Sequence, residues 1–187
     1  MAYEKKNIRA VIEEINSRKI YLPAIQRKYV WDDDQITKLM DSIMLGYPVG
    51  TFLFWRVRKS IVNKKEYSMY EFIKDFHERD MYRNPAAPQP FPVGNDEESL
   101  WAVLDGQQRL TSLYIALQGS MGRKIPLKRW KNDDAFPQKE LYFNLHSNVT
   151  DDEDLSYEFT FLTSNEAQNP KEDKLWYLVK NILKYTQ

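Results

Sequence analysis

Hydrophobic residues recur along the chain with two spacings, one typical of helices and one typical of strands. Spacings of three and four residues predict helices at residues 7–17, 32–46, 67–83, 110–117 and 174–185. Runs of β-branched and aromatic residues predict strands or extended segments at residues 20–22, 27–31, 51–57, 99–104, 140–145 and 157–162. Helices and strands therefore follow one another through a chain of 187 residues, a length that predicts a single domain over residues 1–187.

The segment that begins at Arg83 departs from this pattern. RNPAAPQPFPVGND, residues 83–96, carries four prolines and predicts a loop. Long loops in compact domains often act as lids, so we expect residues 83–98 to be mobile and to lie over the mouth of a pocket. Residues 165–187 predict the start of a helical region, and the chain stops within it, so we expect a fragment of a longer protein.

Composition argues against several kinds of site. The 27 Lys and Arg residues balance 27 Asp and Glu, whereas domains that grip duplex DNA by its phosphates are usually basic. There is no Cys, and His77 and His146 are far apart, which argues against a metal site built on thiolates or a histidine cluster. The chain lacks the apolar runs of a signal peptide or a membrane span, so we expect a cytoplasmic protein that makes no contact with a membrane.

A polar stretch, DGQQR at residues 105–109, joins a predicted strand to a predicted helix. One interpretation is a capping box of Asp105 and Gln108, which leaves Gly106 and Gln107 unexplained. The other is a phosphate site, in which Gly106 admits a ligand to the backbone, the helix N-terminus attracts anions and Arg109 pairs with phosphate oxygens. Asp105 would then hold a divalent cation or orient a water molecule. The residues alone leave both interpretations open.

A second polar cluster lies before the helix predicted from Asp32. Arg27 is a candidate phosphate ligand because its neighbours look buried and a buried Arg requires an anionic partner. Gln26 beside it has the groups to bind a base edge or a phosphate, while Tyr29 and Trp31 are better explained as core residues. The acids at residues 32–34 suit the first turn of a helix, where they offset the helix dipole, better than they suit a metal site.

Three segments together resemble a known family, the N-terminal domain of GmrS in the GmrSD type of modification-dependent restriction system. They are LPAIQRKYVW at residues 22–31, LMDSIMLGYPVGTFLFW at residues 39–55 and VLDGQQRLTSL at residues 103–113. The resemblance extends from about residue 8 to residue 162. Because this family is similar to the ParB and sulfiredoxin fold, it implies an α+β fold with a small mixed sheet flanked by helices, here with a long proline-rich insertion.

The resemblance also implies a nucleotide pocket built from the IQR and DGQQR motifs. These motifs would supply the residues that bind a nucleoside triphosphate of unidentified base: Gln26, Arg27, Gly106, Gln107, Gln108 and Arg109. Asp105 would be the ligand of Mg²⁺, and Asp105 and Arg109 would be the catalytic residues for hydrolysis of the terminal phosphate. The sulfiredoxin reaction is excluded because the turn carries no Cys.

For the whole protein, the resemblance implies an NTPase domain that regulates a nuclease domain or subunit outside this chain. That protein would restrict phage and other foreign DNA, contact DNA in its full-length form and assemble as a homo-oligomer. The alternative is a ParB-like module that binds DNA or a partner and uses the nucleotide only as a switch, without hydrolysis.

Overall fold

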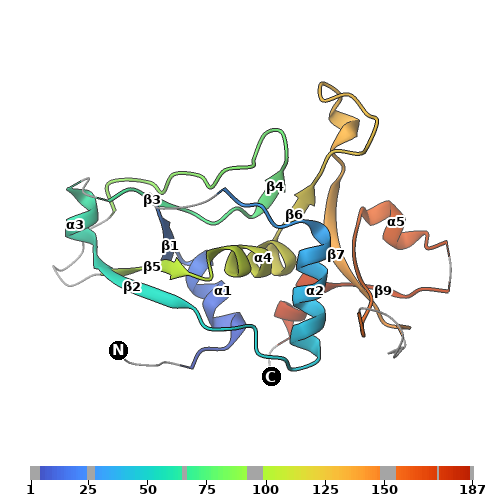
Figure 1. Ribbon diagram of the computed structural model, residues 1–187, viewed down its shortest axis with the longest axis horizontal. Coiled ribbons are helices and arrows are strands. Elements are labelled where there is room, and N and C mark those ends of the chain that lie inside the picture. The colour runs from blue at the N-terminus through green and yellow to red at the C-terminus, as the bar shows by residue number, and fades with distance from the viewer. Residues whose placement is uncertain are drawn as a thin grey trace. The chain divides into compact units, whose positions relative to one another are not determined.

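The computed structural model describes residues 5–24, 28–64, 67–91, 99–147, 155–171 and 173–185. Its fold is α+β, with small mixed sheets flanked by helices, as predicted (Figure 1). Two compact units are built from interleaved segments. The first comprises Met1–Lys28, Thr51–Phe72 and Asn84–Gln107, and the second comprises Tyr29–Gly50, Ile73–Arg83 and Gln108–Gln187. The assignment of residues 1–187 to one domain remains a prediction.

The first unit contains a four-stranded mixed sheet in the order β2-β5-β1-β3. Its strands are β1 (Ile20–Pro23), β2 (Leu53–Arg58), β3 (Met69–Tyr70) and β5 (Ser99–Asp105). β5 runs parallel to β1 and antiparallel to β2, and β3 is antiparallel to β1. Two helices complete the unit, α1 (Ile8–Asn16) and α3 (Lys59–Asn63).

One hydrophobic cluster forms the core around this sheet. Its buried members come from β1, β2, α3, β3, β5 and the segment after β4: Tyr21, Val57, Val62, Met69, Ala87, Phe91, Leu100 and Ala102. The rings of Tyr21 and Phe91 meet edge to face, with their centroids 5.1 Å apart. Burying each large side chain of this kind contributes roughly 1.5–3 kcal/mol, so the cluster fixes β5 and with it the turn that follows β5.

The second unit contains a five-stranded sheet. β4 (Asp75–His77) is parallel to β6 (Ser120–Gly122), and β6 is antiparallel to β7 (Gln138–Asn144). β7 also pairs antiparallel with β8 (Phe159–Leu162) and with β9 (Trp176–Leu178). The helices of this unit are α2 (Asp33–Met44), α4 (Gln107–Gln118, whose first residue belongs to the first unit), α5 (Ser164–Gln168) and the 3₁₀ turns η1 (Asp133–Ala135) and η2 (Val179–Lys184).

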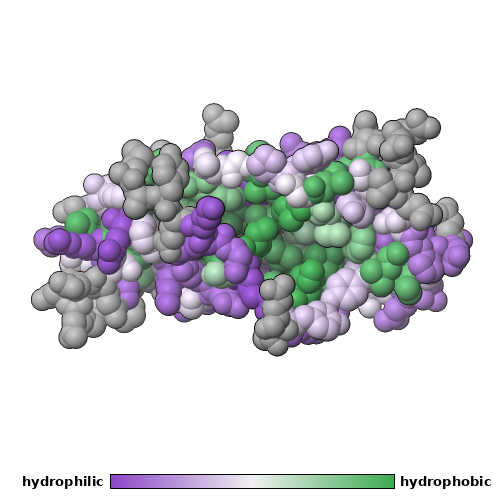
Figure 2. Space-filling model, turned by 90° about the horizontal axis from the view of Figure 1, so that it is seen from below, coloured by the Kyte–Doolittle hydropathy of each residue, from purple (hydrophilic) through white to green (hydrophobic). Residues whose placement is uncertain are grey.

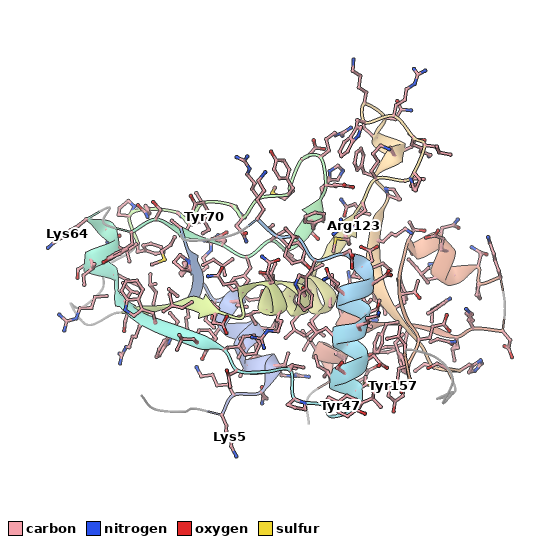
Figure 3. All side chains as sticks on the ribbon, viewed as in Figure 1. Lys5, Tyr47, Lys64, Tyr70, Arg123 and Tyr157 are labelled. Atoms are coloured by element: carbon pink, nitrogen blue, oxygen red, sulfur yellow. The ribbon has the colours of Figure 1, made fainter. Side chains whose placement is uncertain are left out.

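Both ends of α2 are fixed by residues that its sequence pattern identifies. Asp32 and Gln35 form a capping box at its start, and Gly46, with a φ of +75°, follows its end. α2 lies against β8 (Figure 1), and the buried Asp41 carboxylate accepts a 2.8 Å hydrogen bond from the backbone N–H of Tyr157, which Figure 3 labels beside the helix. The helix predicted from Asp32 is therefore confirmed, with its acids at the N-terminus.

The helix predicted over residues 67–83 is wrong. Its four apolar residues are buried as the pattern requires, but they lie on β3, on β4 and between them: Met69, Phe72, Ile73 and Phe76. The backbone finds partners outside the segment, because Glu71 N–H donates to the carbonyl of Pro85 and β4 pairs with β6. Sheet pairing with distant residues thus overrides a helical spacing in a segment rich in strand-forming aromatic residues.

The helix predicted over residues 174–185 is also wrong in kind. Trp176–Leu178 forms β9 on the half of β7 that β6 does not reach, and a 3₁₀ turn follows. Residue 175 illustrates the difference, since Leu175 is 49% exposed although the helical pattern places it in the core. Two adjacent aromatic residues, Trp176 and Tyr177, favour the strand.

Part of the predicted loop is packed against the first unit. Phe91 is buried, its N–H donates to Asn63 Oδ1, and Asn84 Nδ2 donates to the carbonyl of Glu71. Residues 92–98 lie outside the described residues, so the mobility and the lid role predicted for 83–98 remain predictions.

Hydrophobic and hydrophilic residues share the surface. Figure 2 shows residues of both kinds exposed on one face. Among the helices in the described ranges, none has the length and apolarity needed to cross a membrane.

Candidate functional site

The DGQQR stretch forms a sharp turn from β5 into α4. Asp105 is the last residue of β5, lies opposite Leu53 of β2 and is exposed. Gly106 follows with a φ of +84°, a conformation that an L side chain adopts only with strain. α4 begins at Gln107, so Gly106 rather than Asp105 immediately precedes the helix. The capping interpretation of Asp105 and Gln108 remains a prediction.

Gln107 closes this turn within the first unit. Its Nε2 donates a 2.7 Å hydrogen bond to the carbonyl oxygen of Val103, four residues back on β5. The capping interpretation left Gln107 unexplained, and this bond gives it a structural role. Gln107 therefore links the end of β5 to the start of α4.

In the second unit, the next two side chains reach the segments on either side of α2. Gln108 Oε1 accepts a 3.0 Å hydrogen bond from the N–H of Val30, which precedes the helix. Arg109 Nη1 donates to the carbonyl oxygen of Val49, which follows it. The first turn of α4 thus holds the chain before and after α2 by two polar contacts.

Gly50 permits the contact with Arg109. Its φ is +81°, and a Cβ atom at this position would collide with the Arg109 guanidinium. Arg109 is half-buried, and its guanidinium donates a hydrogen bond to a neutral carbonyl.

Arg123 fixes the segment that leads into α2. Figure 3 labels Arg123 near the start of α2; its Nε lies 3.0 Å from Asp33 Oδ1, and its Nη2 donates a 2.5 Å bond to the carbonyl of Trp31. Its guanidinium also lies 5.1 Å from the centre of the Phe76 ring. Burial raises the pKa of Asp33, and the neighbouring Arg123 opposes that rise.

Tyr29 ties the same segment to the middle of α4. Its hydroxyl lies 2.8 Å from Ser112 Oγ in the protein interior, where Ser112 is fully buried. Burial raises the pKa of Tyr29 far above its usual range, against the effect of the Ser112 hydrogen bond. The prediction that Tyr29 is a core residue is confirmed, while Trp31 is only half-buried.

A phosphate bound at this turn would contact mostly backbone groups. The first N–H groups of an α-helix have no intrahelical acceptor and carry a partial positive charge, which suits phosphate oxygens. Within the described residues, no group of three or more His, Cys, Asp and Glu side chains is placed to hold a metal ion. A Mg²⁺ ion bound by Asp105 would therefore take its other oxygen ligands from phosphate and water.

The structure brings together only part of the predicted site. Asp105 to Arg109 form one continuous turn, whereas Gln26 and Arg27 lie outside the described residues. The sequence did not indicate Val30, Val49 or Gly50, because two of them act through backbone groups that leave no trace in the sequence. A glycine two residues after Pro48 was the only available signal.

A family model described as "GmrSD restriction endonuclease, N-terminal domain" matches residues 8–187. The chain belongs to this family. The resemblance drawn from the three motif segments is thus confirmed. The chain is also similar to the uncharacterized protein MJ0686 of Methanocaldococcus jannaschii, with 27% identity over 157 residues. That alignment covers 83% of this chain but 23% of the relative, so this chain spans about a quarter of that protein's length.

Proposed function

We propose that this GmrSD N-terminal domain binds a nucleoside triphosphate at the turn from β5 to α4 and thereby regulates a nuclease that lies outside the chain. The observation that carries the proposal is Gly106, whose φ of +84° turns a fixed strand directly into the first turn of a helix. A phosphate can approach such a turn closely because no Cβ stands in its way. Membership in a restriction endonuclease family supports the defence role.

In this proposal, the backbone and the side chains of the turn have different roles. The N–H groups at the start of α4 hold phosphate oxygens, and Arg109 places its positive charge near the terminal phosphate. Asp105 is exposed and therefore accessible to Mg²⁺ or to a water molecule that attacks the terminal phosphorus. Gln26 and Arg27 belong to the IQR motif. In this proposal, their side chains also bind the phosphates.

The contacts of Gln108 and Arg109 supply a route for regulation. Both residues lie in the first turn of α4 and bind the chain on either side of α2, at Val30 and Val49. A phosphate that draws Arg109 toward it acts directly on the Val49 contact. We propose that the bound nucleotide shifts the segments before and after α2. The rest of a larger protein responds to this shift.

The larger protein is proposed to cleave DNA through a nuclease domain or subunit and to act as a homo-oligomer. Hydrolysis of the nucleotide is a separate step of the proposal, beyond binding. If the domain binds a nucleotide with Mg²⁺ but releases no phosphate, it serves as a nucleotide-dependent switch instead. Phosphate release measured on the same preparation separates these two outcomes.

The experiment is a thermal-shift screen of the chain against ATP, GTP, CTP and UTP, each with and without Mg²⁺. A nucleotide at 100 times its Kd stabilises the folded state by about 2.7 kcal/mol, a shift that is readily measured. We expect one nucleotide to stabilise the domain, and Asp105→Asn to reduce the shift only when Mg²⁺ is present. Because Asp105 is exposed at a strand end, this isosteric change leaves the fold intact.

The matched control is Asp34→Asn, which removes one exposed carboxylate from the first turn of α2. It raises the net charge by one, as Asp105→Asn does, and is expected to leave nucleotide binding unchanged. The proposal is contradicted if no nucleotide stabilises either this chain or the full-length protein, or if both variants lower the shift equally.

A further inference from the structure

The loop between β6 and β7, residues 123–137, is the most basic stretch of the second unit. It carries five basic residues against two acidic ones, in a chain whose total charge is zero: Arg123, Lys124, Lys128, Arg129 and Lys131 against Asp133 and Asp134. Figure 1 shows this β6–β7 loop extending beyond the ends of the two strands. Long loops without regular structure are uncommon in compact domains and usually have a function.

Both acids of the loop are already paired. Lys128 Nζ lies 2.6 Å from Asp134 Oδ2, and Arg79 Nη2 lies 2.8 Å from Asp133 Oδ1. By contrast, Arg129 and Lys131 are exposed and form no ion pair within the parts of the chain that the structure describes. The exposed charge of the loop is therefore positive.

The loop is held in one shape by contacts of its own. Ile125 N–H donates to the carbonyl of Ala135, and Arg79 Nη1 donates to the carbonyl of Trp130. The Trp130 and Phe136 rings are 5.3 Å apart, and Arg79 lies over Phe136 at 5.1 Å. A preformed loop loses little conformational entropy when it binds a partner.

A hydrophobic side chain stands fully in solvent on this basic loop. Leu127 is 103% exposed and has a φ of +67°, a left-handed conformation that costs a non-glycine residue roughly 1–3 kcal/mol. Isolated exposed leucines are common, but a fully exposed one in strained backbone contributes nothing to the stability of the fold. Insertion of the Leu127 side chain into a binding partner would explain its position.

We propose that the β6–β7 loop binds duplex DNA, with Lys124, Arg129 and Lys131 on backbone phosphates and Leu127 as a wedge between base pairs in the minor groove. Proteins that kink DNA insert an apolar side chain between base steps while basic residues contact the flanking phosphates. This surface is separate from the nucleotide site, and the inference does not depend on nucleotide binding.

The aromatic contacts favour duplex over single-stranded nucleic acid. Binding to single strands depends on aromatic rings with an open face on which bases stack. Trp130 is 52% exposed, but its ring already packs against Phe136, with the two centroids 5.3 Å apart. Leu127, at 103%, is the most exposed hydrophobic side chain of the loop, and it is aliphatic.

The test is the fluorescence anisotropy of a labelled duplex of about 20 base pairs, rich in flexible TA steps, titrated with this chain at several salt concentrations. Three neutralised phosphates predict a slope of log K against log salt of about −2.7, since each contributes about −0.9. Arg129→Ser with Lys131→Ser should reduce the magnitude of the slope by about 1.8 and weaken binding at low salt. Leu127→Ala should weaken binding with no change in slope.

The charge-matched control is Lys38→Ser with Lys74→Ser, which removes two exposed cations of the same unit from outside the loop. It should leave the affinity and the slope nearly unchanged. The proposal is overturned if the wild-type chain shows no salt-dependent binding to the duplex, or if the loop and control variants behave alike. Equal affinity for single strands of the same length would overturn the assignment to duplex DNA.

Discussion

The guanidinium of Arg109 lies so close to the backbone of Gly50 that a Cβ atom on Gly50 would collide with it. The contact continues in the hydrogen bond from Arg109 Nη1 to the carbonyl of Val49. A residue of the DGQQR motif and a glycine that follows α2 are thus parts of one structural feature. The motif supports the fold locally, in addition to the binding role proposed for it.

Replacing Gly50 by Ala should destabilise the domain more than a glycine change at an open position. The substitution strains a backbone with a φ of +81° and also displaces Arg109. We expect a loss of roughly 1–3 kcal/mol in the free energy of unfolding, measured by urea denaturation.

Gly46→Ala is the matched control for this change. Gly46 has a similar φ of +75°, but a Cβ atom there would meet nothing within 4 Å. Gly46→Ala should lower the free energy of unfolding only by the cost of the left-handed backbone, roughly 1 kcal/mol. In an Arg109→Ala background the difference between the two variants should largely disappear, and a difference that persists would show that the guanidinium is not its cause.

The buried pair of Tyr29 and Ser112 gives a second prediction. Tyr29→Phe leaves the Ser112 hydroxyl buried without its partner, at a cost of roughly 1–3 kcal/mol in unfolding free energy. Adding Ser112→Ala removes the hydroxyl that lost its partner. The double variant should therefore recover most of the lost unfolding free energy. Chemical denaturation of the two variants and the wild type measures both effects, and a double variant less stable than Tyr29→Phe would contradict the explanation.

The capping box at α5 predicts a dependence on pH. Hydrogen bonds from the Thr163 backbone and side chain lower the pKa of Glu166 below its usual 4.5. Because the folded pKa is depressed, the stabilisation is present above pH 4.5 and is lost as the pH falls through the folded pKa. The side chain is exposed, so we expect only about 0.5 kcal/mol.

The measurement for this prediction is an NMR titration of the Thr163 amide. Its resonance should shift with a midpoint below pH 4.5 in the wild type. Glu166→Gln keeps the size of the side chain and removes its charge, so this variant should show no such midpoint. A midpoint at or above 4.5 in the wild type would mean that the capping contact does not form in solution.

The outcome for individual elements shows what the sequence could and could not predict. α1, α2 and the strands β2, β5, β7 and β8 were predicted to within a few residues, because their caps and apolar patterns are local. β3, β4 and β9 were mistaken for helices, because their backbone partners are distant residues such as Leu22, Ser120 and Asn144. Local spacing carries no information about such pairing.

The helix after the DGQQR turn illustrates the same limit. An amphipathic helix was predicted over residues 110–117, yet every residue of that stretch of α4 is buried. Thr111 and Ser112 look like an exposed face in the sequence, but they are 3% and 0% exposed. The candidate site was found from residue types alone, whereas the roles of Gln107, Gln108 and Arg109 as braces depend on backbone carbonyls and amides that no sequence pattern marks.

The last prediction separates stability from DNA binding at Leu127. Glycine adopts a φ of +67° without strain, so Leu127→Gly should keep or raise the free energy of unfolding, by up to about 1 kcal/mol. Leu127→Ala retains the strain and removes the same apolar side chain. Because the side chain is fully exposed, neither change removes a packing contact in the protein. Both variants should bind the duplex equally weakly, although they differ in stability. If duplex affinity instead followed the order of stability, or matched the wild type in both variants, Leu127 would have no part in DNA binding.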